Sequence, residues 1–176
     1  MLNKLQRNFF SRDAEIVARE LLGKILIRVE DGKEKRARIV ETEAYYGAED
    51  PASRACKNGD LKKTMESEPG EILVYGVHNN WLINFVTGKK EKAEAVLLRA
   101  LEPLNFEERC YGPGLLTKAL NINKDFHNKN LWNCELSILN NKPVTEIIES
   151  FRIGIKKDLP KRLRFYIKDN NHVSRK

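Results

Sequence analysis

The chain contains no run of 18 apolar residues, which is about the length that a membrane-spanning helix needs. Its first residues lack the apolar segment of a secretory signal, so we expect a cytoplasmic protein without a membrane partner. Cysteine is scarce, and Cys56, Cys110 and Cys134 are widely spaced, which argues against a disulfide framework and against a zinc site. The three histidines have no ligand spacing, and no phosphate-binding glycine loop or dinucleotide fingerprint is present. We therefore expect no metal and no cofactor.

The positive charge of the chain is concentrated at one end. The 176 residues carry a net charge of +7, and residues 151–176 account for all of it, with nine Lys or Arg and two Asp. Such asymmetry predicts a polyanionic partner, nucleic acid above all, with Lys161, Arg162 and Arg164 as candidate contacts. The alternative is a solubilising face or a frayed tail.

The length fits one domain over residues 1–176, with a basic C-terminal segment at 151–176. Apolar spacing predicts a helix over 11–23 and a shorter one over 113–120, and it leaves 47–70 as a long loop. Alternation and turn residues predict strands at 24–29, 36–45, 71–75, 81–87, 95–100, 151–155 and 163–167. These elements indicate an α+β fold in which helices flank one curved antiparallel sheet.

The predicted strand at 36–45 carries the strongest chemical signal. Alternation places Ile39, Glu41, Glu43 and Tyr45 on one face. Two neighbouring carboxylates repel each other, and an adjacent ring removes water from them. Both effects raise the pKa of a carboxyl group toward the range of general acid–base catalysis. The alternative is a half-exposed strand face with solvated acids. Tyr45 and Tyr46 are candidates for stacking on a planar ligand, or for ordinary packing.

Three further features suit an anionic or polymeric ligand, and each has a plainer alternative. Arg99 ends an apolar run, where an arginine pairs with a phosphate or with a carboxylate such as one of the two glutamates. Gly112 and Gly114 open a helix whose free N–H groups suit a phosphate, or they simply begin the helix. His78 lies at a predicted turn tip, where it either probes a groove or has no role.

Several stretches together resemble the alkyladenine (3-methyladenine) DNA glycosylases of mammals and bacteria. They follow the order of the family and cover most of the chain: residues 38–45, 47–53, 69–70 with 74–75, 96–103, 112–114 with 119–122, and 163–167. The pieces at 38–45 and 96–103 are the specific ones.

The resemblance implies a monofunctional enzyme that excises damaged purines of the 3-methyladenine, hypoxanthine or ethenoadenine type from double-stranded DNA. Glu43 matches the residue that deprotonates the attacking water, and Arg99 matches an arginine that helps to hold this water. Tyr45 and Tyr75 match two rings that sandwich the flipped base. The resemblance implies no metal or organic cofactor, and we expect a monomer.

The chain departs from the family pattern where the base is recognised. Arg54 stands where the family has a histidine that forms one wall of the base pocket, and its fixed positive charge would oppose a cationic base. The segment after Tyr75 is one residue shorter than usual. His78 then falls near the position of the intercalating residue, and Asn84 matches a pocket asparagine if the gap is real.

Two alternatives to this function remain open from the sequence. One is a nucleic-acid-binding domain without catalysis. The curved-sheet architecture is similar to that of the C-terminal domain of methionyl-tRNA formyltransferases, which binds RNA, so the fold alone does not distinguish the two. The paired carboxylates speak against it. The other is a glycosylase whose altered pocket, with Arg54, prefers a neutral base such as hypoxanthine or an etheno adduct.

Overall fold

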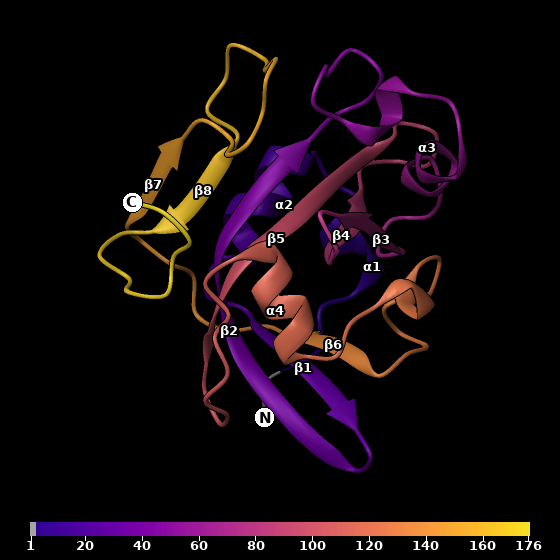
Figure 1. Cartoon of the computed structure of the whole chain (residues 1–176). Coiled ribbons are helices and arrows are strands. Elements are labelled where there is room, and N and C mark those ends of the chain that lie inside the picture. Colours follow the sequence, from indigo (N-terminus) through magenta and orange to yellow (C-terminus); the bar gives the residue numbers. More distant parts are fainter. Residues whose placement is uncertain (1–2) are drawn as a thin grey trace.

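One antiparallel sheet organises the chain. The computed structural model describes residues 3–176. Eight strands form the sheet (Figure 1): β1 (Ile25–Glu30), β2 (Lys33–Tyr45), β3 (Ile72–Val77), β4 (Asn80–Thr87), β5 (Glu94–Pro103), β6 (Leu136–Leu139), β7 (Ile147–Ser150) and β8 (Arg164–Ile167). Their order is β3-β4-β5-β2-β1-β6, and β8 pairs with both β2 and β7.

The length of β2 explains why the sheet curls. Residues 33–38 of β2 pair with β1, whereas residues 41–43 pair with β8 on the same side of the strand. The other side of β2 pairs with β5, with register shifts around Glu41. Bulges of this kind increase the local twist and redirect side chains. The predicted α+β fold with a curved antiparallel sheet is therefore confirmed.

Short helices cover both faces of the sheet: α1 (Arg7–Phe10), α2 (Ala14–Leu21), α3 (Asp60–Met65) and α4 (Pro113–Ala119), with the 3-10 turns η1 (Arg54–Cys56) and η2 (Lys124–Phe126). The Asp13 side chain caps α2 by accepting the N–H of Glu15. The buried residues of α2 recur at helical spacing, and Thr42 of β2 donates to the Ala18 carbonyl at 2.8 Å. Within residues 3–176, no helix is long and apolar enough to cross a bilayer.

Two apolar clusters lie on opposite sides of β2. The larger one contains Ile39 and Ala44 together with α2 and α4 residues. The smaller one contains Tyr45 and Leu97 together with residues from η1 and α3. The smaller cluster forms the floor of the candidate site.

Three predictions of local structure were wrong. Ile39 does not share a face with Glu41, because the bulge in β2 reverses the alternation between them and sends Ile39 into the larger cluster. Residues 151–155 are a loop between β7 and β8, with a turn at 153–154, and not a strand. The span 47–70 is not one long loop, since it contains η1 and α3.

Candidate active site

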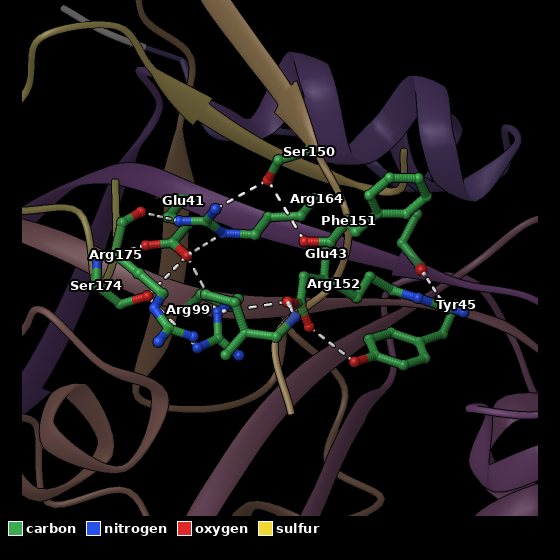
Figure 2. Close-up of polar contacts among 12 residues, drawn as sticks. Glu41, Glu43, Tyr45, Arg99, Ser150, Phe151, Arg152, Arg164, Ser174 and Arg175 are labelled. Carbon is green, nitrogen blue, oxygen red and sulfur yellow. Dashed lines mark hydrogen bonds and ion pairs between the residues drawn. The ribbon is translucent and has the colours of Figure 1, made fainter. Parts of the chain in front are cut away.

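Strands β2 and β5 bring the predicted catalytic residues together. Glu43 of β2 pairs with Leu97 of β5, and Leu97 pairs in turn with Asn84 of β4, so these three positions form one row across the sheet. Figure 2 shows the side chains of Glu41, Glu43 and Arg99 converging. The predicted grouping of Glu43 with Arg99 is therefore present.

The Glu43 carboxylate is buried, accepts two hydrogen bonds and forms one ion pair. Its Oε1 accepts the Ile153 N–H at 2.8 Å, and its Oε2 accepts the Tyr45 hydroxyl at 2.7 Å (Figure 2). The Arg99 Nε lies 3.5 Å from Oε1. Burial raises the pKa of Glu43 above its ordinary value, with a smaller contribution from Glu41, while Arg99 and the other two donors oppose that rise. The result is a desolvated carboxylate that is a stronger base than one in water.

Glu41 has a different environment, which fixes the architecture of the site. Its Oε1 accepts hydrogen bonds from Arg99 Nε at 3.1 Å, from Arg164 Nε at 2.7 Å and from the Ser174 hydroxyl at 2.7 Å. The Ser174 N–H donates to Oε2 at 2.5 Å. The carboxylate thus ties β5, β8 and the C-terminal residues together, and it orients Arg99 toward Glu43.

Arg164 does not lie on the surface, which corrects its assignment as a DNA contact. Its side chain is buried, and besides Glu41 it bonds to the Ser150 hydroxyl at 2.8 Å and to the Arg175 carbonyl. A guanidinium committed to these internal acceptors has no face left for a phosphate. Lys161 and Arg162 are exposed, as their predicted role requires.

Tyr45 is fixed on its ring face as well as at its hydroxyl. The Arg152 guanidinium lies 4.5 Å from the ring centroid, and it is bound by Asp50 through two contacts of 2.6 and 2.8 Å. Burial would raise the pKa of Asp50, but the bonds from Arg152 and from two backbone N–H groups hold it below its ordinary value. Burial and the neighbouring Glu43 raise the pKa of Tyr45 well above its ordinary value, so its hydroxyl remains a donor.

A cavity of about 380 Å³ opens in front of these residues. Tyr45, Tyr75 and Arg54, the predicted base-binding residues, line it, and so does Arg99. Glu43 itself is not exposed in the cavity. However, three residues that contact its carboxylate, Tyr45, Arg99 and Ile153, also line the wall. The carboxylate is therefore one hydrogen bond behind the cavity surface.

The remaining predicted residues divide between the rim of the cavity and the interior. His78 lies exposed at the β3–β4 turn and lines the rim together with Gly114, where a side chain would collide with Asn80 at 2.7 Å. Gly112 precedes α4 but is not part of the lining. Asn84 is buried, donates to the Leu73 carbonyl at 3.2 Å and does not reach the cavity, which departs from its predicted role in base binding.

Four residues that shape the site were not predicted from the sequence. Asp50 and Arg152 form a buried ion pair whose partners are 102 residues apart. Ile153 acts through its backbone N–H, which no residue type predicts. Ser174 contacts Glu41 across 133 residues. Among residues 3–176, no group of three His, Cys, Asp or Glu side chains is arranged to hold a metal ion.

Comparison with known proteins identifies the relatives of this chain. Residues 8–171 match the family described as Methylpurine-DNA glycosylase (MPG). A protein of Legionella pneumophila is 41% identical over 183 residues, covering 99% of this chain and 100% of its own length. Proteins of Aeropyrum pernix and Clostridium botulinum are each 39% identical, covering 97% of this chain and 93% and 98% of their own lengths. All three carry the name "Putative 3-methyladenine DNA glycosylase".

Proposed function

Because the chain belongs to the methylpurine-DNA glycosylase family, and is therefore a DNA repair hydrolase, we propose that it flips a damaged purine out of the duplex and hydrolyses its N-glycosidic bond. The single observation that carries this mechanism is the buried Glu43 carboxylate directly behind the cavity wall. The substrates are purines of the 3-methyladenine, hypoxanthine or ethenoadenine type in double-stranded DNA. The family membership favours this enzyme over a binding domain without catalysis.

The dimensions and walls of the cavity suit a flipped base. A purine must leave the stack before its sugar can be attacked, which costs a few kcal/mol that pocket contacts have to offset. Two tyrosine rings, Tyr45 and Tyr75, line a cavity of about 380 Å³, and aromatic faces are the usual partners of an unstacked base.

The buried carboxylates of Glu41 and Glu43 suit the chemistry at the sugar. A water molecule at the wall formed by Tyr45, Arg99 and Ile153 would lie within reach of Glu43. Glu43 takes a proton from this water as its oxygen bonds to the anomeric carbon and the base departs with the electron pair of the N-glycosidic bond. A cationic purine then leaves neutral, and a neutral purine leaves as an anion that takes up a proton. Positive charge develops on the sugar in the transition state, and a nearby carboxylate stabilises it. The products are the free base and an abasic site. Strand cleavage is not included, because among the described residues that line the cavity none is a lysine that would form a Schiff base.

The proposed function also includes the domain organisation, oligomeric state, location and DNA contacts of the protein. Residues 1–176 act as one domain and as a monomer, in the cytoplasm where the DNA is, without a cofactor. Exposed cations of the basic C-terminal segment, Lys161 and Arg162 among them, bind the DNA backbone.

A single-turnover excision assay tests this proposal. Duplexes that carry hypoxanthine, ethenoadenine or a methylated purine are incubated with excess protein, and the released base is measured beside the Glu43→Gln variant. We expect release by the native chain and not by the variant. Failure of the native chain to release any of these bases, while it still binds the duplexes, would refute the proposed function.

A further inference from the structure

Arg54 occupies a stacking surface of the cavity. Its guanidinium carbon lies 4.5 Å from the centroid of the Tyr75 ring, and both residues line the cavity. A base that stacks on an aromatic ring lies in contact at about 3.5 Å. The guanidinium and a stacked base would thus occupy the same layer above this face of Tyr75, and a base that uses this face has to displace Arg54.

The backbone at Arg54 is held by hydrogen bonds, whereas its side chain is exposed. Ser53 and Ala55 on either side are buried, and the Ala55 N–H donates to the Ser53 hydroxyl at 3.1 Å. The Ser53 N–H donates to the Asp50 carbonyl at 3.0 Å. The Arg54 side chain itself is exposed. When the guanidinium leaves Tyr75, its positive charge therefore stays at the mouth of the cavity.

The cavity presents positive charge without an exposed counter-charge. Arg54 and Arg99 both line it, and no Asp or Glu is among its described lining residues. The carboxylates behind its wall, Glu41 and Glu43, are fully buried and already contact Arg99 at 3.1 and 3.5 Å. In contrast to Arg99, Arg54 contacts a neutral ring, so its charge is the one that an entering base meets.

From this arrangement, and on the basis of the proposed function, we infer that Arg54 makes the enzyme selective for neutral damaged purines over ring-alkylated, cationic ones. Alkylation at a ring nitrogen such as N3 or N7 leaves the purine of a nucleoside with a fixed positive charge. Hypoxanthine and ethenoadenine are neutral, and hypoxanthine also offers O6 and N7 as acceptors for a guanidinium.

Coulomb's law gives the order of magnitude of the effect. For a displaced guanidinium that stays about 6–7 Å from a cationic base near the protein surface, the repulsion changes an equilibrium by roughly 10- to 100-fold. Because Arg54 is exposed and screened by salt, we expect the lower end of this range, about tenfold.

The test compares one neutral and one cationic substrate in the intact protein. Single-turnover rates are measured with excess protein on duplexes that contain hypoxanthine or 7-methylguanine, and the ratio of the two rates is the readout. Arg54→Gln removes the charge and keeps hydrogen-bonding groups, whereas Arg54→Lys keeps the charge. Lys57→Gln, an exposed cation in the same segment, is the matched control.

We expect Arg54→Gln to lower the hypoxanthine-to-methylguanine ratio about tenfold. Arg54→Lys and Lys57→Gln should leave the ratio within about twofold of the native value. An unchanged ratio in Arg54→Gln would overturn the selectivity while leaving the proposed function intact. A native chain that releases neither these bases nor any other lesion would instead refute the proposed function.

Discussion

Replacing Glu43 by glutamine separates its proposed catalytic role from any role in folding. The carboxylate accepts from the Ile153 N–H and from the Tyr45 hydroxyl. A glutamine carbonyl oxygen keeps the first bond, and its amide donates to the Tyr45 oxygen if that hydroxyl reverses direction. The reversed Tyr45 O–H loses its acceptor in the protein and turns toward the cavity that Tyr45 lines, and Arg99 keeps its contact with Glu41. We expect the free energy of unfolding to change by less than about 1 kcal/mol.

The effect on the rate should be far larger. A general base contributes roughly 10²- to 10⁴-fold, and loss of the negative charge beside the sugar also removes electrostatic stabilisation of the transition state. We expect Glu43→Gln to lower the single-turnover excision rate at least about 10³-fold, which corresponds to about 4 kcal/mol. Binding of lesion-containing duplexes, measured by fluorescence anisotropy, should stay near the native value.

Glu41→Gln is the matched control, because it makes the same substitution two residues away. Its main effect should be on the stability of the fold, whereas the main effect of Glu43→Gln should be on the excision rate. The Glu41 carboxylate forms ion pairs with two buried arginines, Arg99 and Arg164. Removal of one partner from a buried ion pair costs about 3–5 kcal/mol of stability. Urea unfolding of both variants distinguishes the two roles. A Glu43→Gln variant that keeps more than a tenth of the native rate, or that destabilises the fold as much as Glu41→Gln does, would refute the catalytic role of Glu43.

Four further predictions rest on the contacts of the site. The excision rate should decline in acid with an apparent pKa above the ordinary 4.5 of a glutamate, because the pKa of Glu43 is raised and its ionised form is needed. The stability that Glu43 contributes is fully present below its unfolded pKa and is lost as pH rises through the raised folded pKa, so Glu43→Gln should gain stability relative to the native chain over that interval. Asp50→Asn should cost about 3 kcal/mol and slow excision, since it leaves Arg152 buried with a weakened partner. Lys161→Gln combined with Arg162→Gln should reduce the slope of log K against log salt by up to about 2.

Each of these predictions has a result that would contradict it. A rate that stays constant down to the ordinary glutamate pKa would mean that another group limits the reaction. An Asp50→Asn variant with native urea unfolding would show that the Arg152 guanidinium is satisfied by its other acceptors, the Ala44 carbonyl and Asp158. An unchanged salt slope would mean that Lys161 and Arg162 form only a solvated face.

The elements that the sequence predicted well are those specified by neighbouring residues. The hairpin of β1 and β2 is an example, because Asp31 and Gly32 adopt the positive φ values of 48° and 72° that a tight turn requires. Helix α2 is another, since Asp13 caps it and its apolar residues share one face. In both cases the deciding interactions lie within a few residues of each other.

The strand predicted at 151–155 was wrong because apolar residues in it line a cavity and do not pair in a sheet. Phe151, Ile153 and Ile155 alternate with other residues as a strand would. In the structure, Ile153 and Ile155 line the cavity, and the Ile153 N–H donates to Glu43 and not to a neighbouring strand. A loop whose residues line a cavity can thus have the periodicity of a strand. The backbone bond that distinguishes the two joins residues 110 positions apart.

Glu41 and Glu43 show why local pattern alone does not assign catalytic roles. The two residues are of the same type, lie on the same strand face and are both fully buried. They differ in their distant partners: Glu41 accepts from Arg164 and Ser174, whereas Glu43 accepts from the neutral donors Ile153 and Tyr45 and is farther from Arg99. Oε1 of Glu41 already accepts three hydrogen bonds, which leaves this oxygen little room for a water molecule. Glu43, with a raised pKa and donors that themselves face the cavity, is the one that is suited to exchange a proton there.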